Sequence, residues 1–426
     1  MPCTVPGVSI HAGGPIPVVD AGVYPASAPG LVLVTVEPMS TTPTPLPDPG
    51  ARVMSDVVAA SLTAYGRDED TIRLAHTDSH AVAAPGPWRG PGREQREEAE
   101  SLLLAPGATR AHGAGTRAIE EEADARRTCF ERDLDRIKYS HPFRRLVGKC
   151  QVFLAPDDVH IRNRMTHAIE VAQVATGVAR AVGCNVALTE AIALGHDCGH
   201  GPGGHASEDA FARYVPGGYD HAVWGANVTL AHLNLCAETL DGIRSHSWRL
   251  PAPSTPCGEI VGIADRVAYV CHDHDDAVRS GILAPGDLPD IVRELCGDRQ
   301  SSQIRAFIAS MIAAVEQTGK IGLTGEYAEA LDAFRAFNYE RIYLRPASIA
   351  QSDRVISMLS GLVEYYAGAP GNIPAVAEGA IAFPQADSDE ATIAAVSYVS
   401  GMTDRFAMAK AQLLLGWSAD ALPRGV

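Results

Sequence analysis

The stretch that decides the fold is residues 165–200, which read MTHAIEVAQVATGVARAVGCNVALTEAIALGHDCGH. Its first half places apolar residues on one broad face at helical spacing, which predicts an amphipathic helix over 165–182. Gly183 is suited to end that helix, and Asn185 is suited to cap a second helix over 186–197. Two successive helices without a strand pattern between them indicate a helical core.

Helical patterns continue on both sides of this stretch. A third long helix is predicted at about 258–280, and charged helical sequence over 117–140 leads into the segment FRRLVGKCQVF. Gly and Pro residues separate the later helical patterns, which lie at 301–318, 325–337, 347–366 and 388–415. Strand patterns are sparse and no internal repeat is found, so we predict an all-α fold.

Residues 1–105 differ in composition from the rest of the chain. They are rich in Pro, Gly, Ser, Thr and Ala, as in TTPTPLPDPG at 41–50. Such segments bury too little apolar surface to offset the entropy of ordering, so we predict a largely disordered extension with a short helix near 54–65. Met39 and Met54 are candidates for an alternative translation start.

The charge and cysteine content restrict the class of protein. A net charge of -16 over 426 residues disfavours broad binding to anionic nucleic acid, although a local cationic pocket can still bind a nucleotide. There is no apolar run of 18 residues for a membrane span, and no basic stretch followed by an apolar region, as in a secretory signal. Nine cysteines without a CxxC pair fit free thiols in a reducing cytoplasm.

Four potential metal ligands lie where the predicted helices can converge. His167 begins the first helix, His196 and Asp197 end the second, and Asp265 lies among apolar residues inside the third. A carboxylate in such a place is costly unless it binds a metal or forms a buried ion pair. Two imidazoles and two carboxylates suit a divalent ion such as Mn, Mg, Fe or Zn. Such an ion lowers the pKa of bound water towards about 7, which phosphoester hydrolysis requires.

The dipeptide His196-Asp197 is weak evidence by itself, because His272-Asp273 and His274-Asp275 also occur. The sequence that follows it, CGHGPGGHASEDAF at 198–211, carries more information. Its glycines and proline predict a tight loop after the helix, and this loop contains His200.

His205 and Glu208 begin the next predicted helix, three residues apart and therefore on one face. A carboxylate that orients an imidazole makes a general acid–base pair, which is the functional interpretation. The structural alternative is a helix N-terminal charge beside a capping residue.

Several blocks of sequence, taken in their order along the chain, resemble the deoxyguanosinetriphosphate triphosphohydrolase family of HD-domain proteins. The blocks are FERDLDRIKYSHPFRRLVGKCQVF (130–153), RNRMTHAIEVAQVA (162–175), EAIALGHDCGHGPGGHASEDAF (190–211), NLCAETLDGIRSHSW (234–248), GEIVGIADRVAYVCHDHDDAVRSG (258–281), NYERIYLRP (338–346) and SYVSGMTDRFA (397–407). The resemblance covers about 120–415 and leaves the first 105 residues outside it.

The resemblance implies an all-helical, metal-dependent hydrolase, and the cysteine content favours a cytoplasmic one. Family members hydrolyse a deoxynucleoside triphosphate (dNTP) to the deoxynucleoside and inorganic triphosphate. The catalytic domain would span 106–426, with a metal-site core at 160–285 and a C-terminal helical part at 300–415. Relatives are oligomers, and some have a second nucleotide site that activates them, so a homo-oligomer and an allosteric nucleotide are implied. Nucleic acid is not the expected main partner.

The resemblance also implies roles for individual residues. The metal ligands of the family match His167, His196, Asp197 and Asp265. The catalytic histidine and its orienting acid match His205 and Glu208. The phosphate contacts match Arg164, His200 and His221. The contacts to the sugar 3′-hydroxyl match Tyr269 and Asp273, which share a helix face with Asp265. Further substrate contacts are expected from Gln151 and Lys149, whereas His272 and His274 are interpreted as structural or solvent-facing.

Two other functions are considered. One is an HD phosphohydrolase of another kind, acting on nucleoside monophosphates, cyclic nucleotides or guanosine tetraphosphate; Tyr269, Asp273 and the C-terminal blocks favour a dNTP instead. The other is a non-catalytic nucleotide sensor or nucleic-acid binder, which the complete ligand set and the His205/Glu208 pair disfavour. The loop GPGGHASE replaces PPFGHAGE of many relatives, a change that concerns base preference more than chemistry.

Overall fold

The computed structural model describes residues 82–154, 158–377 and 382–424, together with four short strands nearer the N-terminus. The chain divides into two units, Met1–Arg89 and Gly90–Val426. In the first unit the strands form two antiparallel pairs, β1 (Ser9–Ile10) with β2 (Val34–Thr35) and β3 (Gly66–Arg67) with β4 (Arg73–Leu74). Strands of two residues are too short to form a sheet with its own core. The predicted helix near 54–65 lies outside the described residues.

The boundary predicted for the disordered extension, residue 105, lies too far along the chain. Residues Arg93–Leu103 within it form helix α2. None of its residues is buried, so no apolar face marks it in the sequence. Its order depends on distant partners instead: Glu100 accepts hydrogen bonds from the backbone of Ala111 (2.7 Å) and from the side chain of Asn185 (2.9 Å). Local sequence patterns cannot report contacts of this kind.

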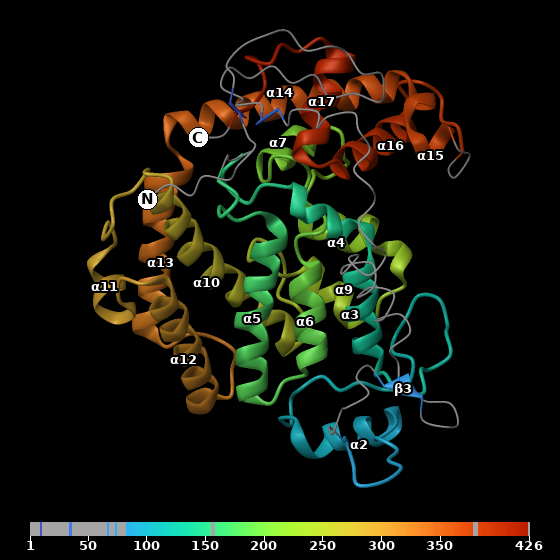
Figure 1. Ribbon diagram of the computed structural model, residues 1–426, viewed down its shortest axis with the longest axis vertical. Coiled ribbons are helices and arrows are strands. Elements are labelled where there is room, and N and C mark those ends of the chain that lie inside the picture. Colours follow the sequence, from blue (N-terminus) through green and yellow to red (C-terminus); the bar gives the residue numbers. More distant parts are fainter. Residues whose placement is uncertain are drawn as a thin grey trace. The chain divides into compact units, whose positions relative to one another are not determined.

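The helices α5 (Arg164–Val182) and α6 (Val186–Gly195) lie at the centre of the second unit (Figure 1). Their ends are local: Asn163 and Asn185 cap the N-termini, and Gly183 ends α5 in the left-handed conformation at φ 74°. α5 packs against α6, α10 (Pro256–Arg279) and α12 (Gln300–Thr318), and α6 packs against α3 (Cys129–Tyr139). The prediction of these central helices is confirmed.

The C-terminal helices divide between two hydrophobic cores. The helices α12 and α13 (Gly325–Asn338) bury side chains such as Phe307 and Phe334 in the core that surrounds α5 and α6. A second core joins α7 (Ala206–Ala212), α14 (Pro346–Gly368), α16 (Asp389–Ser400) and α17 (Asp404–Leu415). The predicted helix over 388–415 is therefore two helices, with a break at residues 401–403.

The predicted helix over 117–140 is wrong in its first half, since only α3 forms within it. The acidic side chains before α3 bind basic residues of that helix instead: Glu121 accepts hydrogen bonds at 2.5 Å from Arg132 and from Arg136. In addition, the Nη1 atom of Arg117 forms an ion pair with the buried carboxylate of Asp133, at a distance of 2.6 Å. These ion pairs hold residues 117–127 as a loop across α3.

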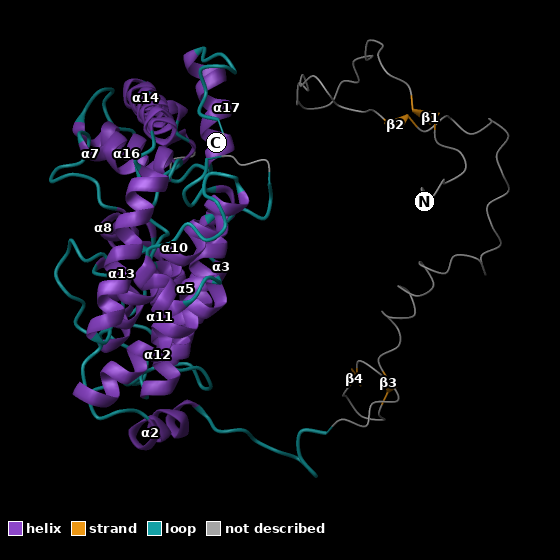
Figure 2. Cartoon of the chain, turned by 90° about the vertical axis from the view of Figure 1, so that its left-hand side faces the viewer, coloured by secondary structure: helices purple, strands orange, loops and turns teal. Residues whose placement is uncertain are grey.

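Short elements complete the second unit (Figure 2). They are α4 (His141–Arg145), η2 (Leu146–Gly148), α8 (His221–Trp224), η3 (Gly225–Thr229), η4 (Ala231–Leu233), α9 (Ala237–Arg244), α11 (Asp290–Cys296), η5 (Tyr339–Tyr343), η6 (Pro370–Asn372) and α15 (Pro374–Ala377). Helices and their connections account for the whole described part of this unit apart from isolated bridges, so the all-α prediction is confirmed.

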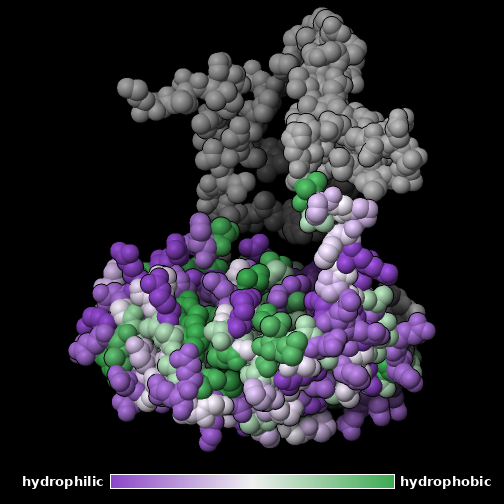
Figure 3. All heavy atoms as spheres, turned by 90° about the horizontal axis from the view of Figure 1, so that it is seen from below, coloured by the Kyte–Doolittle hydropathy of each residue, from purple (hydrophilic) through white to green (hydrophobic). Residues whose placement is uncertain are grey.

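The surface and the thiols match an ordinary globular domain. Hydrophobic residues are interspersed among hydrophilic ones on the face seen in Figure 3. Within the described residues, no helix has both the length and the hydropathy that a membrane span requires. The described cysteines are buried free thiols, as predicted, and burial raises the pKa of Cys198 to about 12.

Candidate active site

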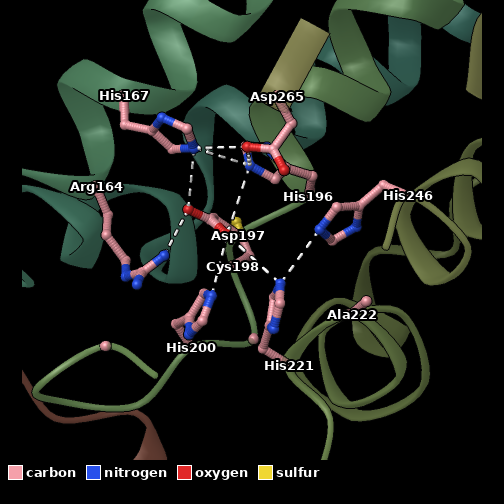
Figure 4. Close-up of polar contacts among 12 residues, drawn as sticks. Arg164, His167, His196, Asp197, Cys198, His200, His221, Ala222, His246 and Asp265 are labelled. Atoms are coloured by element: carbon pink, nitrogen blue, oxygen red, sulfur yellow. Dashed lines mark hydrogen bonds and ion pairs between the residues drawn. The ribbon is translucent and has the colours of Figure 1, made fainter. Parts of the chain in front are cut away.

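The structure brings together all four predicted metal ligands (Figure 4). His167 lies in the first turn of α5, His196 and Asp197 follow α6, and Asp265 lies within α10. The Nε2 atom of His167 lies 3.1 Å from Asp265 Oδ1 and 3.6 Å from Asp197 Oδ2. The Nε2 atom of His196 lies 3.3 Å from His167 Nε2 and 3.5 Å from Asp197 Oδ1.

The spacing of these atoms fits a single metal ion. Four ligand atoms placed tetrahedrally at about 2.1 Å from an ion lie about 3.4 Å from one another. The separations that join His167 and His196 to each other and to the nearest carboxylate oxygens lie between 3.1 and 3.7 Å, close to that value. The donors are also of the right kind, because imidazole nitrogens and carboxylate oxygens suit Mn, Fe and Zn, and carboxylates suit Mg.

Hydrogen bonds behind the two histidines orient their Nε2 atoms towards this centre. His196 donates from Nδ1 to the carbonyl of Ala193 at 2.6 Å. His167 Nδ1 lies 3.2 Å from Nε2 of His272, whose own Nδ1 lies 2.6 Å from a carboxylate oxygen of Glu170. Such outer partners fix the ring orientation of metal-ligating histidines. His272 is fully buried, so its structural interpretation holds and its solvent-facing alternative is wrong.

The electrostatics of the cluster favour a bound cation. Burial alone would raise the pKa of Asp197, but His196, Arg164 and His200 outweigh it and hold that pKa well below its usual range. Burial likewise opposes ionisation of Asp265, and hydrogen bonds from His167 and His196 reverse the effect on its pKa. Burial would lower the pKa of His196, yet the two carboxylates raise it to about 9. Two buried carboxylates that draw a proton onto a histidine are suited to bind a divalent ion.

Beside the cluster, Arg164 and His200 present polar atoms without protein partners. Arg164 is buried and donates from Nη1 to Asp197 Oδ2 at 2.7 Å, while its Nε and Nη2 have no partner. His200 Nε2 lies 3.2 Å from Asp197 Oδ1, and its Nδ1 has no partner. Buried polar atoms without partners are costly. A guanidinium and an imidazole in this state are suited to bind an anion such as a phosphate.

These residues line a cleft of about 550 Å³ that extends well beyond the cluster. The predicted substrate contacts Gln151, Tyr269 and Asp273 also line it. Asp273 accepts a hydrogen bond from Tyr343 at 2.6 Å, and Tyr269 accepts one from Arg335 at 3.2 Å. Burial raises the pKa of Asp273 to about 8. A volume of this size suits a ligand larger than an isolated phosphate.

The predicted pairing of His205 with Glu208 is not what the structure shows. Glu208 accepts a hydrogen bond from Nδ1 of His221, and its other oxygen lies 3.2 Å from Nη2 of Arg249. His205 lines the cleft and stands edge-on to His200, with ring centroids 5.0 Å apart. The two side chains do lie near each other, as their spacing of three residues predicts, in a group that also contains His200 and His221. The carboxylate nevertheless pairs with a histidine thirteen residues further on, a contact that local spacing cannot predict.

Lys149 is also placed differently from the expectation. Its ammonium group is buried and donates to the backbone carbonyls of His200 and of Ser400, the latter at 2.9 Å. It therefore supports the loop that carries His200 and makes no contact with the cleft. His274 is buried as well, and its Nε2 lies 2.8 Å from the carbonyl of Asp287, in agreement with a structural role.

Several residues of the cleft are not predicted from the sequence. They include His246, Arg249, Arg266, Arg335 and Tyr343. Arg266 stacks on the ring of Trp248, with the guanidinium carbon 3.6 Å from the ring centroid. His246 and Tyr343 lie in blocks that carry the family resemblance, so that signal was available. Their chemistry becomes apparent only once the fold brings them to one cleft.

Gly199 determines the shape of the loop that holds His200. A Cβ at this position would lie 2.0 Å from the carbonyl oxygen of His221 and 2.5 Å from the amide nitrogen of Gly225. Both are backbone atoms, which cannot rotate away. The loop therefore packs against the segment of His221 only because residue 199 has no side chain.

Gly199→Ala is accordingly expected to destabilise the protein by about 1–3 kcal/mol or more, because overpacking moves the backbone. Activity should fall as well, because the shift displaces His200 and His221. Gly177→Ala is the matched control, since a Cβ there meets nothing within 4 Å and alanine favours a helix. Thermal unfolding of both variants checks the prediction, and an equal or higher Tm for Gly199→Ala would contradict it.

Comparison with known proteins agrees with this geometry. Residues 164–270 match the HD domain family model, and residues 321–413 match the phosphohydrolase-associated domain model. The first match includes all four candidate ligands, so fold and site together define an HD-domain hydrolase. The chain belongs to the deoxyguanosinetriphosphate triphosphohydrolase-like family.

Three relatives, each named deoxyguanosinetriphosphate triphosphohydrolase-like protein, illustrate the similarity. The protein of Caldanaerobacter subterraneus is 37% identical over 324 residues, covering 75% of this chain and 94% of the relative. That of Desulfatibacillum aliphaticivorans is 34% identical over 342 residues, covering 75% and 97%. That of Clostridium perfringens strain SM101 is 35% identical over 301 residues, covering 67% and 86%.

Proposed function

We propose that this protein hydrolyses a deoxynucleoside triphosphate, dGTP or another dNTP, to the deoxynucleoside and inorganic triphosphate. The observation that carries the proposal is the set of side chains that line the cleft described above. It joins the metal-ligand cluster and the unpartnered groups of Arg164 and His200 to the polar pair Tyr269 and Asp273. Such a cleft provides for a phosphate chain and for a sugar. The names of the relatives support the same reaction.

The cluster of His167, His196, Asp197 and Asp265 would hold a divalent ion. Such an ion stabilises negative charge on phosphoryl oxygens and supplies an activated water at neutral pH. The remaining requirements fall on the chain's own side chains. These must bind the triphosphate, hold the sugar and protonate the leaving oxygen.

Arg164 and His200 bind the phosphate chain in this proposal. The free Nε and Nη2 of Arg164 can donate to phosphate oxygens while Nη1 keeps its bond to Asp197. This bond fixes the guanidinium before substrate arrives, so little side-chain entropy is lost on binding. His200 Nδ1 becomes a second donor when the anion draws a proton onto the ring.

His205 protonates the leaving group in this proposal. Water attacks the α-phosphorus, the bond from phosphorus to the 5′-oxygen breaks, and the 5′-oxygen takes its proton from the His205 imidazolium. In the free protein His205 lies exposed at the cleft, and partial desolvation together with the charge of Arg164 lowers its pKa. A bound triphosphate neutralises Arg164 and adds negative charge, which raises that pKa towards the working range. Glu208 takes part by orienting His221.

Tyr269 and Asp273 bind the sugar 3′-hydroxyl in this proposal. Tyr343 donates to Asp273 and Arg335 donates to Tyr269, and these bonds fix the two side chains in the cleft. A buried carboxyl with a raised pKa can exchange hydrogen bonds with a hydroxyl without the cost of burying a charge.

Asp273→Ala is expected to raise KM for a dNTP by about tenfold, as the loss of one hydrogen bond to a buried carboxyl predicts. The matched substrate is the 2′,3′-dideoxynucleotide of the same base, which lacks the hydroxyl. Wild-type protein should prefer the dNTP over this analogue, and the variant, which keeps only the Tyr269 contact, should prefer it much less. A variant that keeps the full preference would contradict the assignment of Asp273.

The reaction itself is tested by its products. Purified protein is incubated with Mn²⁺ and one dNTP, and anion-exchange chromatography resolves the phosphates that are released. Inorganic triphosphate supports the proposal, whereas single phosphate or pyrophosphate would place the attack at a different phosphorus.

A further inference from the structure

Asp404 is a buried carboxylate that the proposed mechanism does not use. It is the first residue of α17 and is 4% exposed. Its Oδ1 accepts a hydrogen bond from the backbone amide of Gly203 at 2.9 Å, and its Oδ2 accepts one from the amide of Cys150 at 2.8 Å. A buried carboxylate is costly unless hydrogen bonds replace those to water, and bonds from backbone amides to a carboxylate are strong. One side chain of the C-terminal helices therefore holds two segments that are distant in sequence.

The first segment is the loop between α6 and α7, which carries both His200 and His205. Gly203 lies between these histidines, and its φ of 76° is in the left-handed region that favours glycine. A Cβ at this position would lie 2.5 Å from Cγ1 of Val355 in α14. The loop is therefore packed closely against the C-terminal helices, and its position depends on where Asp404 holds the Gly203 amide.

The second segment contains residues 149–150 and is joined to the start of α5. Cys150 pairs with Asn163 in an isolated antiparallel bridge, and the amide of Arg164 donates to the carbonyl of Lys149 at 3.0 Å. Because Asp404 binds the amide of Cys150, it is connected through this short pairing to the first turn of α5.

Lys149 adds another link between the same parts of the chain. Its ammonium group donates to the carbonyl of His200 and to the carbonyl of Ser400, the last residue of α16. Gly148 packs so closely on the turn between α16 and α17 that a Cβ would lie 2.7 Å from Cγ2 of Thr403. This turn therefore contacts both segments at several points.

Arg164, from the start of α5, and His200, from the loop, meet at Asp197 (Figure 4). Nη1 of Arg164 lies 2.7 Å from Oδ2 of Asp197, and Nε2 of His200 lies 3.2 Å from Oδ1. The spacing of the guanidinium and the imidazole thus depends on how the two segments are placed relative to each other. A displacement of about 1 Å between groups that act on one substrate can lower a rate by about 10²-fold.

We propose that Asp404 is a positioning residue for the active site. Other described residues line the cleft, and Asp404 acts on them through the amides of Gly203 and Cys150. The consequence for catalysis rests on the proposed function, in which Arg164 and His200 bind the phosphate chain. The consequence for the order of the two segments does not rest on it.

Asp404→Asn tests this role with almost no change of shape. The side chain of asparagine has one oxygen, so it can accept from only one of the two backbone amides, and its NH₂ group faces the other. Hydrogen–deuterium exchange, measured by mass spectrometry, should become about tenfold faster in peptides covering 148–154 and 199–205, because a protecting bond is lost. Exchange at the centres of α5 and α6 should stay at the wild-type rate. Asp389→Asn, at the exposed first residue of α16, is the matched control and should change neither.

The loss of activity in Asp404→Asn should depend on the substrate. With a dNTP, kcat should fall by about 10²-fold, because groups from both segments act on the triphosphate and on the leaving oxygen. With bis(4-nitrophenyl) phosphate, which has no triphosphate and a leaving group that needs no proton, the fall should be at most about threefold. A variant that is merely less well folded would lose the same factor on both substrates, and that result would overturn the proposal.

The exchange experiment has further decisive outcomes. Unchanged exchange in both segments of Asp404→Asn, or a uniform rise that includes the centres of α5 and α6, would overturn the proposal. Should the variant not fold, wild-type protein still decides: its peptides containing Gly203 and Cys150 should exchange slowly, and fast exchange there would contradict the two bonds to Asp404. Faster exchange confined to the two segments, in a protein that releases no triphosphate from any dNTP, would support the positioning role and refute the proposed function.

Discussion

Asp265→Ala is expected to abolish metal binding at the site formed with His167 and His196, and with it the hydrolysis of substrate. The carboxylate lies 3.1 Å from His167 Nε2 and 3.7 Å from His196 Nε2, so it is central to the cluster. Its removal leaves Asp197 as the only carboxylate there. Loss of several kcal/mol of charge stabilisation corresponds to a fall in kcat of at least about 10³-fold.

Asp275→Ala provides the control for this prediction. Asp275 lies on the same helix, and its carboxylate is partly exposed and pairs with Arg162 at 2.9 Å, away from the metal ligands. This variant should keep both its metal and its activity. Metal content measured on folded, desalted protein separates the two cases. Undiminished metal at the His167 and His196 site in Asp265→Ala would refute the ligand role of Asp265.

His205→Ala is expected to lower kcat by about 10²- to 10⁴-fold while the metal content stays at the wild-type level. The imidazole lines the cleft and contacts none of the four candidate ligands through a hydrogen bond, so its loss should affect protonation of the leaving oxygen alone. His232→Ala, on the surface, should leave kcat unchanged.

A second substrate shows whether His205 acts as an acid. The 4-nitrophenolate ion leaves bis(4-nitrophenyl) phosphate without needing a proton. His205→Ala should therefore lose far less activity on this substrate than on a dNTP. An equal loss on both would indicate a structural role for His205, and full activity on a dNTP would remove it from the mechanism.

The parts of the fold that could be predicted from the sequence are those determined by residues close together in the chain. Asn163, Gly183 and Asn185 determine the ends of α5 and α6 through bonds to residues a few positions away. Gly401 lies where the predicted helix over 388–415 breaks. A single glycine is tolerated within a helix, so its presence alone did not predict the break. The order of α2 depends on Asn185 and other residues far along the chain, and no local pattern reveals it.

The same distinction holds within the site. His196 and Asp197 are adjacent in sequence, and Asp265 is conspicuous as a carboxylate in an apolar helix, so the ligand set could be predicted. The partner of Glu208 could not, because His221 lies thirteen positions further along the chain, beyond the end of α7. The approach of His246 to His221 likewise depends on the packing of α8 against α9.

The central claim is that this protein releases the whole phosphate chain of a dNTP in one step. Purified protein is incubated with Mn²⁺ and each dNTP singly, then with dNTP mixtures, because a second nucleotide can be an activator. Anion-exchange chromatography then resolves the products. We expect deoxynucleoside and inorganic triphosphate in equal amounts, with rates that rank the bases. Deoxynucleoside diphosphate with phosphate, or monophosphate with pyrophosphate, would contradict it, and so would the absence of turnover with every mixture.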